Sequence, residues 1–224
     1  QKYGANALGL QRVLGFGSYR TPWTWLHKLR RAMVRPGRDR LSGIVEVDES
    51  YIGGKKAGKR GRGAAGKTLV VIAVQLDGSR IGRIRLRQVP DASAESLEDA
   101  VQQAVEVGSE VRTDGWAGYN RLNRLGYIHE IVREEVDVGD NLLPFCHLTA
   151  GLLKRWLLGT HQGAVSHEHM DYYLDEFTFR FNRRTSRYRG KLFYRLLQQA
   201  MTVEPVPLKA IVKHARGRMP QHNI

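Results

Sequence analysis

Acidic residues in two predicted strands have the spacing that a metal site needs. Residues 44–54 read IVEVDESYIGG, whose β-branched apolar residues predict a strand in which Glu46 and Asp48 share one face. Asp114 ends another short predicted strand, in the stretch VRTDGWAGY. If the two strands are neighbours, Asp48 and Asp114 meet at the sheet surface and can hold Mg²⁺, which prefers carboxylate oxygens and leaves room for phosphate. The alternative is an acidic strand face exposed to water.

A paired metal site of this kind activates water or a 3′-hydroxyl on one side of a phosphodiester and stabilises the leaving oxygen on the other. Such chemistry requires a third ligand besides Asp48 and Asp114. We expect the three ligands to converge on one metal cluster.

Alternating strand and helix patterns predict an α/β domain with a mixed sheet. Gly115 and Gly118 allow a sharp exit from the strand that ends at Asp114. The predicted elements are strands at 44–52, 68–77, 81–89, 110–114 and about 127–133, and helices at about 93–106, 145–158 and 167–183.

Two short helices are predicted ahead of this domain, separated by the glycine turn GFGS at 15–18. In the second, Thr21 suits the N-cap and Pro22 the first helical position. The apolar positions of this helix are Trp23, Trp25, Leu26, Leu29 and Met33. A helix-turn-helix that contacts DNA and a helical hairpin packed on the next domain both fit this pattern. PGRDRLSG at 36–43 is typical of a linker.

The composition favours a polyanionic partner, most simply nucleic acid. The 224 residues include 36 Lys plus Arg against 22 Asp plus Glu, a net charge of +14. No apolar run reaches the roughly 18 residues of a membrane-spanning helix. The single cysteine, Cys146, excludes an intrachain disulfide, and no signal peptide opens the chain, so we expect a reducing cytoplasm.

Several long motifs resemble the DDE insertion-sequence transposases of the insertion sequence 1595 group. They are GIVEVDESYIGGKK, VRTDGWAGY and LLKRWLLGTHQGAVSHEHMDYYLDEFTFRFNRR, and the likeness extends to the residues before the first aspartate. The resemblance implies an RNase H-like sheet flanked by helices and Mg²⁺-dependent cleavage and joining of DNA strands at transposon ends. It makes Asp48 the first metal-binding carboxylate and Asp114 the second. Glu46 and Glu49 receive an electrostatic or structural role.

The third ligand departs from the common pattern of the family, which is a glutamate on a helix with a lysine or arginine seven residues later. Counting back from Lys154 reaches His147, so the catalytic residues implied are Asp48, Asp114, His147 and Lys154. Seven residues are nearly two helical turns, which places His147 and Lys154 on one face. Imidazole is a softer ligand than carboxylate and suits Mn²⁺ better than Mg²⁺.

The resemblance also implies an organisation and partners. We expect a helical DNA-binding segment at 1–40, an RNase H-like catalytic domain at 41–201 and a basic tail at 202–224. The partner is double-stranded DNA, bound by a homo-oligomer at the nucleoid of a prokaryotic cytoplasm. The N-terminal zinc ribbon that is usual in the family is not found in this sequence, so a truncated, catalytically silent DNA-binding remnant is the alternative function.

Basic residues in three places are candidates for contacts with DNA phosphates. The second predicted helix carries three of them, the glycine-rich loop at 53–67 carries six, and the FNRR segment carries two. They are Lys28, Arg30 and Arg31; Lys55, Lys56, Lys59, Arg60, Arg62 and Lys67; and Arg183 and Arg184. The alternative for the loop is simple solvation.

Two tempting motifs are rejected. GRGAAGKT at 61–68 matches the Walker A pattern, but a strand follows it where a P-loop needs a helix. His161, His167 and His169 lack zinc-site spacing and a cysteine pair, so a structural or surface role is expected. Trp116 either packs against the wall of the site or stacks on a base.

Overall fold

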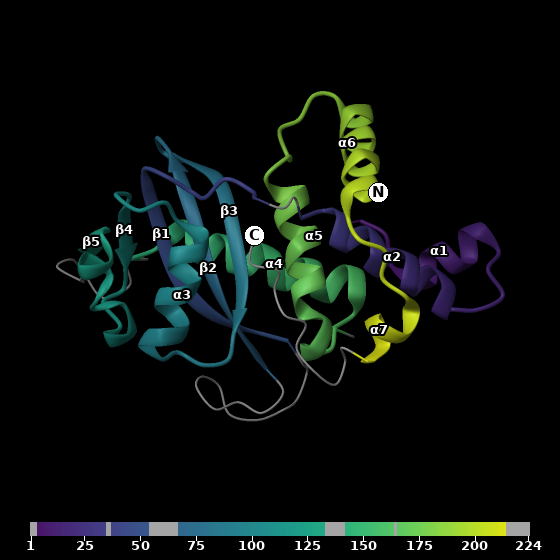
Figure 1. Cartoon of the computed structure of the whole chain (residues 1–224), viewed down its shortest axis with the longest axis horizontal. Coiled ribbons are helices and arrows are strands. Elements are labelled where there is room, and N and C mark those ends of the chain that lie inside the picture. Colours follow the sequence, from purple (N-terminus) through teal and green to yellow (C-terminus); the bar gives the residue numbers. More distant parts are fainter. Residues whose placement is uncertain (1–3, 35–36, 54–66, 133–141, 164, 214–224) are drawn as a thin grey trace. The chain divides into compact units, whose positions relative to one another are not determined.

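The computed structural model describes residues 4–34, 37–53, 67–132, 142–163 and 165–213. The chain divides into two compact units (Figure 1). We call residues 39–155 the sheet unit, and Gln1–Arg38 together with Trp156–Ile224 the helical unit. The boundaries differ from the predicted ones, because the residues from 156 onward group with the N-terminal helices rather than with the sheet.

The described part of the sheet unit contains one five-stranded mixed sheet with the order β3-β2-β1-β4-β5 (Figure 1). β1 pairs with β2 antiparallel and with β4 parallel. The first and fourth strands are therefore neighbours, as the metal-site prediction required. The strands are β1 (Ile44–Ile52), β2 (Thr68–Asp77), β3 (Arg80–Val89), β4 (Glu110–Thr113) and β5 (Ile128–Ile131).

The side-chain pattern explains the central strands. Val45 and Val47 on β1 are fully buried on the face opposite Glu46 and Asp48, which is the alternation of a pleated strand. β2 is buried over most of its length, as expected for a strand covered on both faces. The hairpin from β2 to β3 turns at Gly78, whose φ of 59° lies in the left-handed region.

Helix α3 (Ala94–Ala104) covers one face of the sheet (Figure 1). Its apolar residues pack in one core with β1, β2 and β4. Ser93 caps the helix by accepting a hydrogen bond from the Ser96 N–H at 3.3 Å. The predicted helix at 93–106 is therefore confirmed.

The chain leaves β4 through the predicted sharp exit. Gly115 has a φ of 80°, and an added Cβ there would lie 2.6 Å from Ile131 Cγ2. Two 3-10 turns follow, η1 (Ala117–Tyr119) and η2 (Leu122–Leu125), and lead into β5. Glycine is therefore required at the point where the chain turns away from Asp114.

Helix α4 (Pro144–His161) begins one residue before the predicted helix and ends three residues after it. Its residues up to Arg155 belong to the sheet unit. The predicted site residues His147 and Lys154 both lie in that part.

The described part of the helical unit is α-helical apart from one 3-10 turn. Its α2 packs against α1, α5, α6 and α7. The elements are α1 (Ala7–Leu14), α2 (Arg20–Ala32), η3 (His167–His169), α5 (Met170–Phe181), α6 (Arg189–Thr202) and α7 (Leu208–Lys213). α7 lies in the segment predicted to be only a basic tail, whose residues 214–224 lie outside the described residues.

The start and the buried face of α2 differ from the prediction. The helix begins at Arg20, so Thr21 lies in its first turn and is not the N-cap. Trp25 and Leu29 are exposed, whereas His27 and Arg30 are buried. Arg30 is buried because it forms an ion pair that is described below. His27 is buried because its ring packs against the rings of Trp23, His169 and Tyr173. The hydrophobic pattern reveals neither contact.

Among the helices that the structure describes, none combines the length and the apolar composition needed to cross a membrane.

Candidate active site

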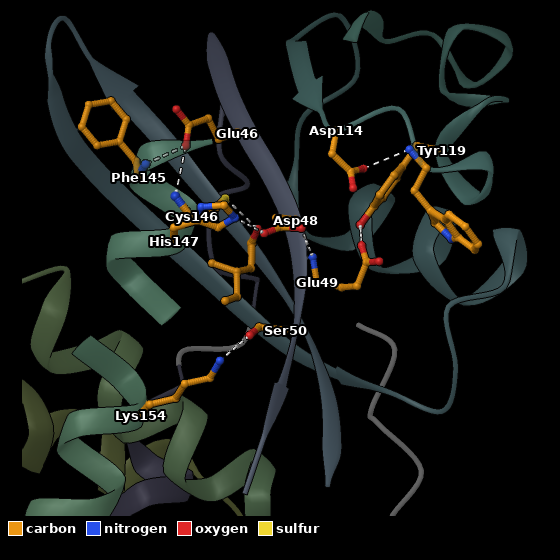
Figure 2. Close-up of polar contacts among 12 residues, drawn as sticks. Glu46, Asp48, Glu49, Ser50, Asp114, Tyr119, Phe145, Cys146, His147 and Lys154 are labelled. Carbon is orange, nitrogen blue, oxygen red and sulfur yellow. Dashed lines mark hydrogen bonds and ion pairs between the residues drawn. The ribbon is translucent and has the colours of Figure 1, made fainter. Parts of the chain in front are cut away.

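Alternate residues of β1 contact helix α4 (Figure 2). Glu46 meets the first turn of the helix, Asp48 meets His147, and Ser50 meets Lys154. Side chains two residues apart share one face of a strand. Glu46, Asp48 and Ser50 therefore form a row of polar residues that faces α4. The acidic face noted in the sequence is therefore directed at a helix and is not simply exposed to water.

Asp48 and His147 are in direct contact. The distance from His147 Nε2 to Asp48 Oδ2 is 3.3 Å, and the Asp48 side chain is 15% exposed. The other carboxylate oxygen, Oδ1, accepts a hydrogen bond from the Glu49 N–H at 2.8 Å. Burial raises the pKa of Asp48, and the Asp114 charge adds to that rise, whereas His147 and Lys154 oppose it.

Asp114 lies immediately after β4, the strand that pairs parallel to β1. The pairing of Glu46 with Arg112 sets the register, so Asp48 and Asp114 each follow by two residues along neighbouring strands. Asp114 Oδ1 accepts a hydrogen bond from the Trp116 N–H at 2.9 Å, which fixes the turn that follows. Its charge contributes to the raised pKa of Asp48.

The donor set fits a hard divalent cation. Asp48 and Asp114 offer carboxylate oxygens and His147 an imidazole nitrogen. The raised pKa of Asp48 means that its neighbours do not fully compensate its buried charge, which a cation would do. Within the described residues, no three acidic, His or Cys side chains already stand at metal-binding spacing, so only the contact between Asp48 and His147 is preformed.

Lys154 lies two turns beyond His147 on α4. Its Nζ donates a hydrogen bond to Ser50 Oγ at 2.8 Å. Burial lowers the pKa of Lys154, the nearby Lys67 ammonium lowers it further, and Asp48 opposes both. The Lys154 ammonium therefore lies beside the acidic face of β1, where it offers positive charge to a phosphate.

Sequence reasoning missed Tyr119 as a member of the site. This fully buried side chain donates its hydroxyl to Glu49 Oε2 at 2.9 Å (Figure 2). Burial, followed by the charges of Glu49, Asp48 and Asp114, raises the pKa of Tyr119 well above 10, so the hydroxyl remains a donor. The only signal in the sequence was its place in VRTDGWAGY, and this contact gives Glu49 the structural role that was expected for it.

Trp116 packs against the wall of the site. Its Nε1 donates a hydrogen bond to the Ala92 carbonyl at 3.1 Å, and its ring contacts the core of the sheet unit. Of the two roles considered for Trp116, the structure supports packing.

The candidate DNA-binding residues of α2 fall into two classes. Lys28 is exposed and Arg31 is half-buried. Arg30 is 2% exposed, and its Nε donates to Glu176 Oε2 at 2.8 Å. The prediction that Arg30 contacts DNA is therefore wrong, because its guanidinium is engaged in a buried ion pair.

Of the other basic residues predicted to contact DNA, the structure describes Arg183 and Arg184 but not most of the glycine-rich loop. The Arg183 guanidinium lies 3.9 Å from the centre of the Phe179 ring, and that of Arg184 lies 4.2 Å from the Phe181 ring. Both arginines remain candidates for phosphate contacts. The loop residues Lys55, Lys56, Lys59, Arg60 and Arg62 lie outside the described residues.

The two rejected motifs stay rejected. Thr68, the last residue of the Walker A match, begins β2 rather than a helix. His169 hydrogen-bonds to Ser166 Oγ at 2.8 Å and to the Ile211 carbonyl at 3.3 Å, and His161 packs edge-on against Trp156. These two histidines are structural.

Comparisons with solved structures give low similarity over much of the chain. The catalytic core of bovine immunodeficiency virus integrase is 13% identical, with a TM-score of 0.41, and the match covers 72% of this chain and 97% of that one. A chain of the simian T-cell lymphotropic virus intasome, bound to a PP2A regulatory subunit, is 12% identical, with a TM-score of 0.37 and coverage of 88% and 65%. A chain of the pre-cleavage Mos1 transpososome is 16% identical, with a TM-score of 0.36 and coverage of 80% and 62%.

The sequence itself matches a family. No curated protein matches it, but the ISXO2-like transposase domain family matches residues 40–182. The match contains Asp48, Asp114, His147 and Lys154. The mixed five-stranded sheet with its flanking helices confirms the predicted α/β fold class. Since the matched residues make up more than half of the chain, this protein belongs to the ISXO2-like transposase domain family.

Proposed function

We propose that this protein is a DNA transposase that cleaves phosphodiester bonds at the ends of an insertion sequence and joins the freed strand to target DNA. The observation that carries this proposal is the contact between Asp48 and His147 beside Asp114, inside the matched family region. The fold positions these groups by placing β4 parallel to β1 and α4 against the acidic face of β1.

Asp48, Asp114 and His147 would hold the divalent cation, Mg²⁺ or Mn²⁺. When bound, it supplies activation of water or a 3′-hydroxyl and stabilisation of the leaving oxygen. The hydrogen bond from the Trp116 N–H holds Asp114 in its turn. The Lys154 ammonium, held over β1 by Ser50, is placed to bind a phosphate oxygen.

The ligand set favours Mn²⁺ over Mg²⁺ in this chain. His147 takes the place of the glutamate that is common in the family, and a neutral imidazole is a softer donor than a carboxylate. His147 is 55% exposed, so its ring is accessible from solvent.

DNA binding in the proposed function uses basic residues of both units. In the described residues these are Lys28, Arg31, Lys67, Arg183 and Arg184. The loop residues Lys55, Lys56, Lys59, Arg60 and Arg62 add to them on sequence grounds. The substrate is double-stranded DNA, and the working form is a homo-oligomer assembled on it in the cytoplasm of a prokaryote.

The test is strand cleavage on the matched ends of the element, with Mg²⁺ and then with Mn²⁺. Cleavage at the transposon boundary by the parent protein, lost in Asp114→Asn, supports the transposase. DNA binding without cleavage in either cation supports the DNA-binding remnant instead. Cleavage at the same rate on DNA without the end sequence supports a nuclease of the same fold class.

A further inference from the structure

The residue that precedes helix α4 cannot cap it with a side chain. The first N–H groups of a helix have no partner within the helix. The His147 N–H donates to the Leu143 carbonyl at 3.0 Å, which makes Leu143 the N-cap residue. A leucine side chain cannot accept a hydrogen bond, and Pro144 in the first helical position has no N–H to satisfy. The N–H groups of Phe145 and Cys146 therefore need an acceptor from elsewhere.

Glu46 of β1 supplies that acceptor. Its Oε2 accepts hydrogen bonds from the Phe145 and Cys146 N–H groups, both at 3.0 Å, across a sequence separation of 100 residues for Cys146 (Figure 2). The residue is 4% exposed. Negative charge at a helix N-terminus is also favoured by the helix dipole. A buried carboxylate on a strand thus caps a helix that is remote in sequence.

The cap lies directly beside the proposed metal ligands. Cys146 immediately precedes His147 on α4, and Glu46 and Asp48 are two residues apart on one face of β1. The Cys146 thiol also donates to the Ile72 carbonyl of β2 at 3.4 Å. The first turn of α4 is therefore attached to the sheet at the point where His147 reaches Asp48.

We propose that Glu46 is a positioning residue that holds His147 against Asp48 by capping α4. This inference rests on the proposed function, in which His147 and Asp48 bind the same cation. Glu46 Oε2 accepts hydrogen bonds from both N–H groups, and in this proposal Glu46 acts through His147. A residue that only stabilised the fold would lower stability without changing the affinity of the metal site.

The experiment compares cap variants in the full chain. Glu46→Ala removes the acceptor, and Glu46→Gln keeps an oxygen that can accept both hydrogen bonds. Ser93→Ala is the matched control, because it removes the cap of α3, a helix of the same unit that carries no proposed metal ligand. Each variant is studied at a temperature where circular dichroism shows it folded.

The first readout is Mn²⁺ affinity, measured by electron paramagnetic resonance of the free ion. Loss of a residue that orients a metal ligand weakens metal binding by about 10- to 100-fold, and we expect a loss in that range for Glu46→Ala. Glu46→Gln should recover most of it, and Ser93→Ala should match the parent. In a His147→Ala background, Glu46→Ala should have no further effect, because the ligand on which it acts is gone.

In the metal-affinity measurement, two results would overturn the inference. One is an unchanged Mn²⁺ affinity in Glu46→Ala, with only a loss of stability like that of Ser93→Ala. The other is an additive loss in the double variant, which would mean that Glu46 does not act through His147.

The second readout needs neither metal nor DNA, and it separates this inference from the proposed function. It is the distance from His147 Nε2 to Asp48 Oδ2 in crystal structures of the parent and of Glu46→Ala. Loss of the 3.3 Å contact in the variant supports positioning, and its retention contradicts it. If the parent neither binds Mn²⁺ nor cleaves DNA, the proposed function fails, while this distance still decides whether Glu46 positions His147.

Discussion

His147 Nε2 lies 3.3 Å from Asp48 Oδ2, and these two side chains come from a helix and a strand that are far apart in the sequence. The contact joins a soft nitrogen donor to a buried carboxylate. In the proposed function, this contact sets the metal preference, and the mutational tests of the site are built on it.

Replacing His147 by Glu should shift the metal preference of strand cleavage. A carboxylate restores a hard oxygen donor, so the ratio of the rate in Mg²⁺ to the rate in Mn²⁺ should rise by about tenfold or more. Single-turnover cleavage in each cation measures the ratio. His167→Glu, at an exposed position, is the control and should leave the ratio unchanged. An unchanged ratio in His147→Glu would show that His147 is not a metal ligand.

Substitutions of Lys28 and Arg30 should affect different properties, although both are basic residues of α2. Lys28→Ala should weaken DNA binding and lower the slope of log affinity against log salt by about 1, because an exposed phosphate contact is lost. Filter binding at several salt concentrations measures the slope. A slope equal to that of the parent would show that Lys28 does not contact phosphate.

Arg30→Met should instead destabilise the helical unit. Removing the guanidinium takes from the buried Glu176 its closer ion-pair partner, at 2.8 Å, and leaves it only the longer contact with Arg180 at 3.6 Å. Breaking a buried ion pair in this way costs up to about 3 to 5 kcal/mol. Urea unfolding at neutral pH measures the free energy of unfolding. The double variant Arg30→Met/Glu176→Leu should recover much of the loss, and a loss of equal size in both variants would contradict this account.

Acid should destabilise the helical unit through two buried histidines. Burial, followed by the charge of Arg30, lowers the pKa of His27 to about 2 and that of His161 to about 4, from 6.5. Below pH 6.5 the unfolded chain therefore binds more protons than the folded one, and stability is lost as the pH falls toward those values. Each group contributes up to about 1.4 kcal/mol per pH unit in that window.

The measurement is urea unfolding between pH 7 and pH 5 for the parent and for His27→Leu. The variant should lose less stability over this range, since its titrating group is absent. His167→Asn, at an exposed position, serves as the control. Parallel stability curves for the parent and His27→Leu would mean that His27 is not held neutral.

Sequence patterns predicted the part of the site that depends on strand periodicity and on local spacing. The alternation in β1 placed Glu46 and Asp48 on one face, and the order of elements made β1 and β4 candidates for neighbours. The spacing of seven residues between His147 and Lys154 placed both on α4. These features could be predicted because they follow from the backbone geometry of strands and helices.

The remaining features depend on contacts between distant segments. The cap that Glu46 gives to α4 could not be predicted, because it depends on how a helix packs on a sheet 100 residues away. The burial of Arg30 in α2 could not be predicted for the same reason, since its ion pair with Glu176 joins residues 146 apart in the sequence. Hydrophobic periodicity assigns charged residues to the surface and cannot foresee a buried partner.

The most direct test of the account is strand cleavage on the matched ends of the element by the parent and by Asp114→Asn, in Mg²⁺ and in Mn²⁺. Asparagine keeps the shape of Asp114 but removes the charge that the cation needs, so cleavage should fall by at least about a hundredfold while DNA binding is kept. Cleavage by the parent and its loss in the variant is the result that the account predicts. Equal cleavage by both proteins, or no cleavage by the parent in either cation, would contradict it.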